Sequence, residues 1–531
     1  MILFDRKSLR SVASIFAVIT LLWLSPPTRA EAASEPSSGG FERHLQQFWG
    51  LANVAGIQVV ALPSGNVVWE YRADDPLLTA SLMKVMTSYS ALKKLGPYYH
   101  FKTSVWASRA PRNGVIEGDV WLKGEGDPFF ITEKAWWLAQ RIYSLGIRRI
   151  EGSVWVDNGY FSPSTQQICL DGRCDSPYNP VVSATALEFN SIVYNLLPGL
   201  AAGEPASVEI FPPGGYARVR NEAITGKPGS QAPIWIRSSG IIEQGDSPGE
   251  NFHVGGHVPL RLRMGAEHRL NVHSPAAFAA HVFKTLLEQS GVKVVGGVGG
   301  EGTVHKRAFR LTDYESPPLC DLLYGLNRFS NNFMAEMLFR VVGAEAGGEP
   351  GTAEKGSLAV RTIISRLGVP PEEIDVDGGS GLSRSCRVSA RAFCRVLVDA
   401  YNDFGINAEF LSSLARNGRE GTLRRRLQTA KPGIQVRGKT GTLRDVISFA
   451  GYVSGPDGDT YAAAVILNQV NQTGAARAAI DRMLAAIPDL ADEVKASGGF
   501  TPPRLQKLPV RQVIMERKPH VEQIRGTAKK K

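Results

Sequence analysis

Apolar and polar positions follow different patterns in three parts of the chain. Near the start, two apolar runs flank a Pro-Ser-Gly-Asn turn in "GIQVVALPSGNVVWEY" (56–71), a pattern typical of a β-hairpin. The stretch that begins at residue 79 is predicted as one helix, which ends at Gly96-Pro97, a helix-terminating pair. The first hundred residues therefore predict a hairpin followed by a helix.

The middle of the chain, from about residue 97 to 305, has a different pattern of apolar and polar residues. Short strand-like runs such as "GDVWLKGEGDP" are separated by turn residues, and helices are expected only near 133–145 and 275–290. This block is therefore predicted to be mostly β.

The chain becomes helical again after the middle block. Amphipathic helices are expected in 317–344 and 351–369 from their apolar spacing. Three strands follow at 434–443, 446–455 and 461–469, and then a last helix at "GAARAAIDRMLAAI". Strands near both ends of the chain are most simply explained as one sheet, which the middle block interrupts.

These elements predict an α/β (α+β) fold with more than one domain, because 531 residues exceed one ordinary core. The expected parts are a leader (1–32), the first part of a main domain (41–96), one or two inserted β-rich domains (97–305), the second part of the main domain (306–495) and a basic tail (496–531).

The first 32 residues have the order of a secretory signal peptide. Arg6, Lys7 and Arg10 precede the apolar run Val12–Leu24, and small residues follow at Ala30-Glu31-Ala32. A short membrane anchor is the alternative, but about thirteen apolar residues fall short of the roughly 20 that span a bilayer. We expect cleavage near the end of this segment and an exported, periplasmic protein.

The net charge of +10 is concentrated at the ends of the chain. Residues 1–32 carry about +2 and residues 501–531 about +7, so the body is left at about +1. A nearly neutral body argues against a nucleic-acid partner. The basic tail is interpreted as a disordered solubilising segment, with weak contact to a membrane surface or wall polymer as the alternative.

Five cysteines in an exported chain favour disulfides and leave at least one thiol unpaired. Cys169 and Cys174 bracket "LDGR", a turn-like loop, and form the most favourable pair. Cys386 and Cys394 could also meet, and Cys320 would then be free.

The pattern Ser-x-x-Lys occurs at Ser81–Lys84, Ser90–Lys93 and Ser290–Lys293. A lysine can accept a serine proton only when it is substantially neutral. The first pair begins a helix, where unpaired N–H groups disfavour an ammonium and can support an anionic substrate oxygen. The second lies at the helix C-terminus, which keeps lysine charged, and the third spans a glycine and leaves its helix. Only the first pair is placed for nucleophilic catalysis.

Two further motifs downstream contain the other residue types that acyl transfer needs. Ser330-Asn331-Asn332 provides a proton relay to a leaving amine, and Lys439-Thr440-Gly441 provides a cation for a substrate carboxylate. Each motif alone is weak, since Ser64-Gly65-Asn66 fits the second but lies in a hairpin turn. Together and in order, the three motifs are the set found in penicillin-binding proteins and class A β-lactamases.

With these motifs the chain resembles the penicillin-binding proteins, and more closely the low-molecular-mass class C group, the D-alanyl-D-alanine carboxypeptidase/endopeptidase family (peptidase family S13). The resemblance covers residues 41–490 and is carried by "LTASLMK", "SNN", "GKTGT" and the long gap from Lys84 to Ser330. It implies a penicillin-binding-protein/β-lactamase-like transpeptidase domain, with an antiparallel sheet flanked by helices. Asn331 replaces the commoner aspartate of the second motif, and little harm is expected.

The resemblance implies a serine-type carboxypeptidase of peptidoglycan stem peptides, with possible endopeptidase activity. Ser81 would attack the penultimate carbonyl of a peptide ending in D-Ala-D-Ala and form an acyl-enzyme, with Lys84 as the base. Ser330, supported by Asn332, would pass a proton to the departing amine.

The third motif would bind the substrate. Lys439 would pair with the terminal carboxylate or maintain the electrostatic field around the relay serine, and Thr440, Gly441 and Thr442 would line the edge strand. The N–H groups of Ser81 and Thr442 would form the oxyanion hole. No metal or other cofactor is expected, and β-lactam antibiotics would bind covalently as substrate mimics.

Other motifs have plainer interpretations. Residues 297–302 match a dinucleotide-binding pattern but precede a strand or loop, and His253 and His257 are interpreted as a loop pair. Asp127 is interpreted as turn-forming, with a cleft-facing position as the alternative. Arg424-Arg425-Arg426 either engages an anionic glycopeptide or forms a solvated helix face.

Two rival functions are weighed against the peptidase. A β-lactamase or serine esterase on the same fold is disfavoured by the inserted region and by the lack of an identifiable second base. A catalytically idle wall-binding protein is disfavoured by the three intact motifs.

Overall fold

The computed structural model describes residues 39–163, 169–227, 233–242, 248–262, 264–428 and 430–496. The predicted signal peptide and all but the first residue of the predicted tail lie outside these residues. In the described part of the chain, no helix has the length and apolar character that crossing a membrane requires.

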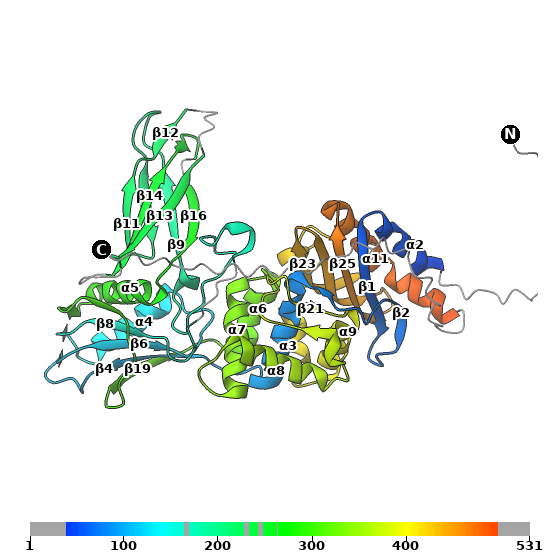
Figure 1. Ribbon diagram of the computed structural model, residues 1–531, viewed down its shortest axis with the longest axis horizontal. Coiled ribbons are helices and arrows are strands. Elements are labelled where there is room, and N and C mark those ends of the chain that lie inside the picture. The colour runs from blue at the N-terminus through cyan, green and yellow to red at the C-terminus, as the bar shows by residue number, and fades with distance from the viewer. Residues whose placement is uncertain are drawn as a thin grey trace, which may run out of the picture. The chain divides into compact units, whose positions relative to one another are not determined.

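Strands from both ends of the chain form one antiparallel sheet of six strands (Figure 1). Their order across the sheet is β2 (Val67–Tyr71), β1 (Ala52–Ala61), β25 (Thr460–Val470), β24 (Val446–Ser454), β23 (Gln435–Leu443) and β22 (Ala415–Arg416). The predicted hairpin and the three predicted late strands are all present. The prediction of one sheet built from both ends is therefore confirmed.

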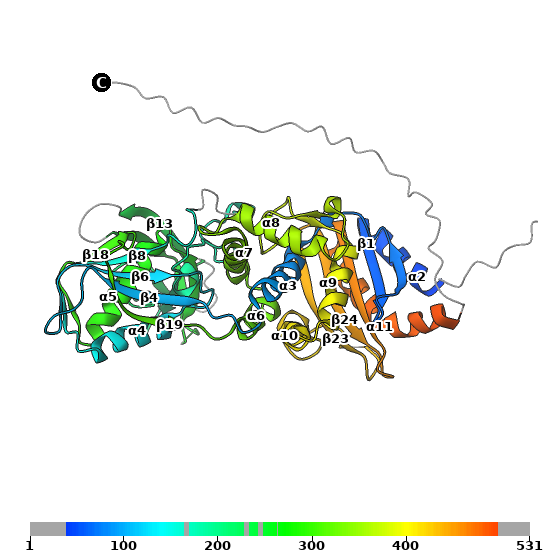
Figure 2. The ribbon, with the colours of Figure 1, turned by 90° about the horizontal axis from the view of Figure 1, so that it is seen from below.

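Helices cover both faces of this sheet (Figure 2). On β25, Ala462, Ala464 and Ile466 belong to the core shared with the helices around α3, whereas the intervening Ala463 and Val465 belong to the core shared with α11. This alternation places successive side chains on opposite faces. Because both faces are buried, β24 and β25 are apolar at nearly every position instead of alternating with polar residues.

The helices of this part are α2 (Gly39–Trp49), α3 (Met83–Leu95), α6 (Leu319–Arg328), α7 (Asn332–Gly347), α8 (Ala353–Ser365), α9 (Ala390–Asn402), α10 (Asn407–Ser413) and α11 (Thr473–Ala496). The last helix was expected to end at residue 487 but continues through Pro488. Leu490, Ala491 and Val494 remain buried beyond that proline. Their packing maintains the helix despite the hydrogen bond that proline cannot donate.

Residues of the middle block form a separate set of sheets with their own hydrophobic core. The largest sheet has the order β18 (Val298–Glu301), β8 (Val154–Asp157), β6 (Val120–Gly124), β4 (Lys102–Ala107) and β19 (Phe309–Glu315), packed with α4 (Thr132–Ser144) and α5 (Pro275–Gln289). Both predicted helices of this block are present. The sheet continues past residue 305, because β19 pairs with β4.

Shorter strands complete the structure. Two three-stranded sheets have the orders β10 (Ser207–Phe211), β9 (Ser191–Leu197), β16 (Ala266–Asn271) and β11 (Ala217–Asn221), β14 (Gly249–Gly255), β13 (Trp235–Ile242). The remaining groups are β12 (Ile224–Gly226) with β15 (His257–Pro259); β17 (Lys293–Val294), β7 (Arg149–Ile150) and β5 (Val115–Ile116); and β20 (Ile374–Asp375), β21 (Arg387–Val388) and β3 (Leu77–Leu78).

The cysteine predictions are confirmed at one pair and wrong at another. Cys169 and Cys174 form a disulfide, and Cys320 is free. Cys386 and Cys394 are both buried and free, which corrects the suggestion that they meet. The Cys386 thiol donates to Asp377 Oδ1 at 2.9 Å, and the Cys394 thiol donates to the Gln58 carbonyl at 3.4 Å. Each thiol thus has its own local partner.

Candidate active site

Ser81 lies in a short 3₁₀ turn, Ala80–Leu82, that leads directly into α3. The preceding strand β3 is held to β25 by the Asn468 side chain, which accepts from Leu78 N at 2.9 Å and donates to Leu78 O at 3.0 Å. Ala80 adopts a φ of 50°, in the left-handed region that L residues seldom occupy. Such a strained backbone is maintained only by surrounding contacts. The turn therefore presents Ser81 in a fixed position.

The Lys84 amine, one helical turn beyond Ser81, is fully buried and has three oxygen partners. Its Nζ lies 3.1 Å from Ser81 Oγ, 2.7 Å from Asn332 Oδ1 and 2.7 Å from the Ser380 carbonyl. Burial lowers the pKa of Lys84 to about 7, and the nearby Glu336 carboxylate opposes that shift. A substantial share of the amine is therefore neutral near pH 7 and able to accept the Ser81 proton.

The second motif lies at a break between two helices. Residues 317–344 were expected as one helix, but α6 ends at Arg328 and α7 begins at Asn332, with Ser330 between them at φ 58°. The Asn331 side chain caps α7 by accepting from Met334 N at 3.0 Å. Since aspartate caps helices equally well, asparagine at this position retains the local structure.

Hydrogen bonds at both the oxygen and the nitrogen of its side-chain amide orient Asn332. Its Oδ1 accepts from the Lys84 amine, and its Nδ2 donates to the Tyr178 carbonyl at 2.8 Å. Tyr178 follows the loop that the Cys169–Cys174 disulfide closes, and the side chain of its neighbour Asn179 hydrogen-bonds to Leu170 and Arg173 in that loop. The middle block thus supplies a backbone oxygen that orients a side chain of the site.

Lys439 on β23 is fully buried and contacts the second motif. Its Nζ donates to Ser330 Oγ at 2.8 Å and to the Thr440 carbonyl at 2.7 Å. Burial, together with repulsion from Lys84, lowers the pKa of the Lys439 amine well below its usual range. Two roles were predicted for Lys439. This geometry favours the electrostatic role beside Ser330 over direct pairing with the substrate carboxylate.

The remaining residues of the third motif lie on an open strand edge. The short strand β22 pairs only with Arg437 and Gly438, so the following residues of β23 have no neighbouring strand on that side among the described elements. A Cβ at Gly441 would lie 2.2 Å from Ser448 Oγ and 2.8 Å from the Thr79 carbonyl. Only glycine allows β23 to pass this close to the turn that carries Ser81.

Two residues without a role in the predicted mechanism support this cluster. Glu336 on α7 accepts from Ser380 N at 2.9 Å and from Ser380 Oγ at 2.6 Å, and Ser380 O in turn accepts from Lys84. Gly381 has φ 77°, and a Cβ there would meet the Ala80 carbonyl at 1.8 Å. The glycine-rich stretch "DGGSGLSR" is the sequence signal for this loop, whereas Glu336 has no comparable signal.

The competing Ser-x-x-Lys pairs are not part of the cluster. Ser90 is buried without a hydrogen-bond partner for its hydroxyl in the described structure, and Lys93 forms ion pairs with Asp399 and Asp403. Hydrogen bonds to those carboxylates outweigh burial and raise the pKa of Lys93. Ser290 Oγ donates to Leu286 O at the end of α5. The choice of the first pair agrees with this geometry.

The other motifs also have structural roles. Residues 298–301 form strand β18, and Asp127 accepts from Phe129 N as a turn-forming residue. His253 and His257 lie on strands β14 and β15, which corrects their assignment to a loop, because parallel pairing with β11 and β12 orders both segments. Residues 424–426 follow a short 3₁₀ turn, so they are not on a helix face.

Comparisons with known proteins agree with this site. Residues 39–487 match the D-Ala-D-Ala carboxypeptidase 3 (S13) family. The chain is 33% identical to the D-alanyl-D-alanine carboxypeptidase of Actinomadura sp. (strain R39) over 425 residues, which are 76% of each chain. It is 23% identical to D-alanyl-D-alanine carboxypeptidase DacB of Haemophilus influenzae over 415 residues, 76% of this chain and 83% of the relative.

The fold is similar to that of penicillin binding protein 4 from Haemophilus influenzae. That crystal structure is matched with a TM-score of 0.67 at 21% identity, over 84% of this chain and 98% of that one. A structure of the same protein complexed with a β-lactam is matched with a TM-score of 0.65. These matches confirm the predicted fold class.

Proposed function

The chain belongs to the D-Ala-D-Ala carboxypeptidase 3 (S13) family and is a serine-type D-Ala-D-Ala carboxypeptidase, and we propose that Ser81 is its nucleophile and Lys84 its base. The observation that carries this assignment is the buried Lys84 amine, 3.1 Å from Ser81 Oγ, with a pKa of about 7. The two rival functions then become outcomes of the experiments below.

Acylation begins when the neutral Lys84 amine removes the proton from Ser81 Oγ. The oxygen attacks the carbonyl of the penultimate D-alanine, and a tetrahedral oxyanion forms. We assign its stabilisation to the backbone N–H groups of Ser81 and Thr442. Substrate lying along the open edge of β23 would present its carbonyl to both groups.

The proton returns to the leaving group through Ser330. Because Lys439 donates to Ser330 Oγ, the serine's own hydrogen is free to point toward the substrate nitrogen. As the C–N bond breaks, Ser330 donates that proton to the departing D-alanine amine and is reprotonated by the proton held on Lys84. Asn332 holds the Lys84 amine in place for this transfer.

Deacylation reverses the roles with water as the nucleophile. Lys84 removes a proton from water, the hydroxide oxygen attacks the Ser81 ester, and the proton passes to Ser81 Oγ as the ester bond breaks. A β-lactam would follow the first half of this path and acylate Ser81. Its leaving nitrogen stays attached to the acyl group, so the adduct would persist.

The proposed substrates are peptidoglycan stem peptides, reached after export to the periplasm. The exported location rests on the leader-like sequence of residues 1–32 and on the Cys169–Cys174 disulfide, because disulfides persist in oxidising compartments. Contact of the basic tail with a membrane surface or wall polymer is a weaker proposal, which rests on its charge alone.

We also propose that residues 97–305 form a β-rich insertion within a transpeptidase-like domain made of residues 41–96 and 306–495. Supporting this division, residues of the middle block have a hydrophobic core of their own, whereas strands from both outer parts share one sheet. Strand β19 pairs with the inserted sheet and extends the insertion to about residue 315.

Digestion of purified muropeptides tests the function. Wild-type protein should release free D-alanine from monomers that end in D-Ala-D-Ala, and a folded Ser81→Ala variant should release none. Separation of cross-linked dimers into monomers would add endopeptidase activity. Rapid turnover of benzylpenicillin without D-alanine release would indicate a β-lactamase instead, and inactivity of folded wild type would indicate an idle binding protein.

A further inference from the structure

The substrate's terminal carboxylate needs a cation that Lys439 is poorly placed to supply. The Lys439 amine is buried, occupied by Ser330 Oγ and the Thr440 carbonyl, and pushed toward its neutral form by burial and by Lys84. A buried amine that already donates to two protein oxygens has little hydrogen-bonding capacity left for an anion in the cleft. Further cationic groups along the edge of β23 are therefore candidates for binding the carboxylate.

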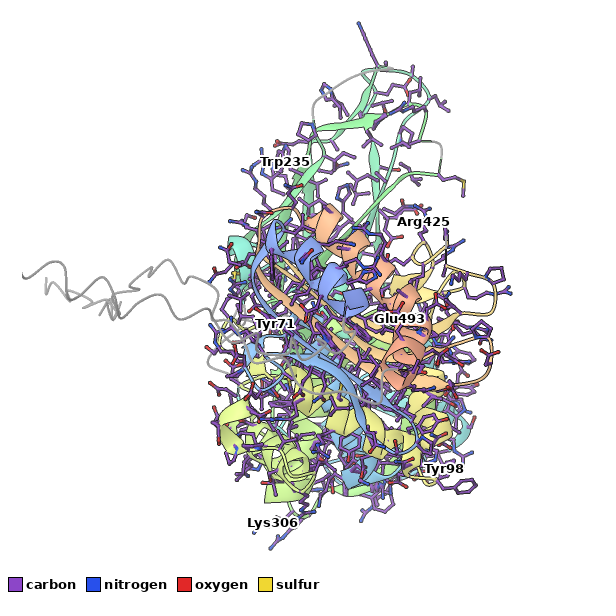
Figure 3. The ribbon with its side chains drawn as sticks, turned by 90° about the vertical axis from the view of Figure 1, so that its right-hand side faces the viewer. Tyr71, Tyr98, Trp235, Lys306, Arg425 and Glu493 are labelled. Atoms are coloured by element: carbon purple, nitrogen blue, oxygen red, sulfur yellow. A yellow bond between two sulfur atoms is a disulfide. The ribbon has the colours of Figure 1, made fainter. Side chains whose placement is uncertain are left out.

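A cleft of about 490 Å³ lies beside the other face of the same strand. Side chains alternate across a strand, so Thr440 and Thr442 project opposite to Lys439 and Gly441. Both threonines line this cleft, together with Arg425 and Arg477. Figure 3, in which Arg425 is labelled, shows its loop beside α11. Two threonines and two arginines thus line one cleft beside the open edge of β23.

The charge of this cleft is unbalanced. Arg426, the third arginine on its lining, donates from Nε at 3.0 Å and from Nη2 at 2.6 Å to Asp481 Oδ1, and this bidentate pair cancels one charge of each sign. Arg425 and Arg477 have no ion pair or hydrogen bond from their side chains to any described residue. Two guanidinium charges therefore remain for an external anion, and guanidinium is the side chain best shaped to bind a carboxylate.

We propose that Arg425 and Arg477, with the hydroxyls of Thr440 and Thr442, bind the C-terminal carboxylate of the leaving D-alanine. This inference rests on the proposed function and adds a binding site for the leaving residue to it. It also assigns the arginine run at 424–426: Arg425 binds substrate, Arg426 is a structural ion pair, and Arg424 is a solvated neighbour that does not line the cleft.

The test compares two substrates that differ only in the proposed contact. One peptide ends in D-Ala-D-Ala with a free carboxylate, and its partner ends in the corresponding amide. Wild type should prefer the carboxylate, and the double variant Arg425→Gln/Arg477→Gln should lose about 10- to 100-fold in kcat/KM on it, the range expected for charge-assisted hydrogen bonds. Turnover of the amide should stay within about twofold of wild type.

Arg424→Gln is the matched control, because it removes the same charge from the same run without touching the cleft. Its preference for the carboxylate should equal that of wild type, and thermal melting should show all variants folded. An unchanged carboxylate preference in the double variant would overturn the proposal. So would an equal loss on both substrates, which indicates a structural role. Failure of Ser81 catalysis would look different, since wild type would then cleave neither peptide.

Discussion

We predict that the low pKa of Lys84 makes the proposed acylation of Ser81 depend on pH in a defined direction. Burial brings this pKa from its ordinary 10.5 to about 7. Only the neutral amine can accept the Ser81 proton, so the acylation rate should be low in acid, rise through about pH 7 and then level off. The same titration should appear with a β-lactam and with a peptide.

The size of the effect follows from the neutral fraction of the amine. At pH 7 about half of the Lys84 amines are neutral, against roughly one in 3000 for a lysine of ordinary pKa. From about pH 6 to about pH 8 the neutral fraction rises about tenfold, and the acylation rate should rise by the same factor.

The substitution Glu336→Gln should change the pKa of Lys84 and so tests the same pH dependence independently. The Glu336 carboxylate raises the pKa of Lys84, so its removal should move the midpoint of the rate profile to lower pH. Glutamine can still accept the two hydrogen bonds from Ser380, which preserves the loop.

Stopped-flow measurement of acylation by a fluorescent penicillin, at constant ionic strength, checks both profiles. A rate that does not change with pH, or a midpoint near the ordinary lysine value, would refute Lys84 as the base. A shift of the Glu336→Gln midpoint to higher pH would refute the predicted effect of the Glu336 charge on the pKa of Lys84.

Three further predictions concern stability and the supporting loop. The unfolded chain keeps the Lys84 proton to about pH 10, whereas the folded chain releases it near pH 7. The unfolding free energy of wild type, measured with urea, should therefore rise relative to that of Lys84→Met as pH increases between these values. Asn331→Ala should cost about 1 kcal/mol of unfolding free energy through loss of the helix cap, whereas Asn331→Asp should be nearly neutral in the same assay. Replacing Cys169 and Cys174 by serine should slow acylation several-fold, since the Tyr178 carbonyl that orients Asn332 follows the disulfide loop directly and the neighbouring Asn179 side chain is hydrogen-bonded to that loop. Unreduced, denatured wild type should titrate three thiols.

The sequence was informative where local signals are strong. The late strands carry apolar runs bounded by turn residues, and the hairpin at 56–71 has a distinct turn, so both were predicted correctly. The three motifs pointed to Ser81, Ser330 and Lys439 because acyl transfer needs a nucleophile with a base, a proton relay and a cation, and these motifs contain those residue types. In the structure, hydrogen bonds connect the three motifs: Lys84 contacts Ser81 and Asn332. Lys439 contacts Ser330.

Features that depend on distant contacts were not predictable in this way. Glu336 acts through Ser380, and Asn468 holds β3 from the opposite end of the chain. Nothing in the local pattern of either residue reveals those partners. The break at Ser330 was missed for a related reason, because apolar spacing continues across it while tertiary packing stabilises the left-handed backbone there.

The identity of the nucleophile is tested most directly by the intact mass of protein treated with benzylpenicillin. Wild type should gain the mass of one benzylpenicillin, mapped by peptide analysis to Ser81, and Ser81→Ala should gain none. Ser90→Ala is the matched control: its hydroxyl is buried without a partner in the described structure, so the variant should fold and label fully. Loss of labelling in folded Ser90→Ala, or its persistence in Ser81→Ala, would contradict the account.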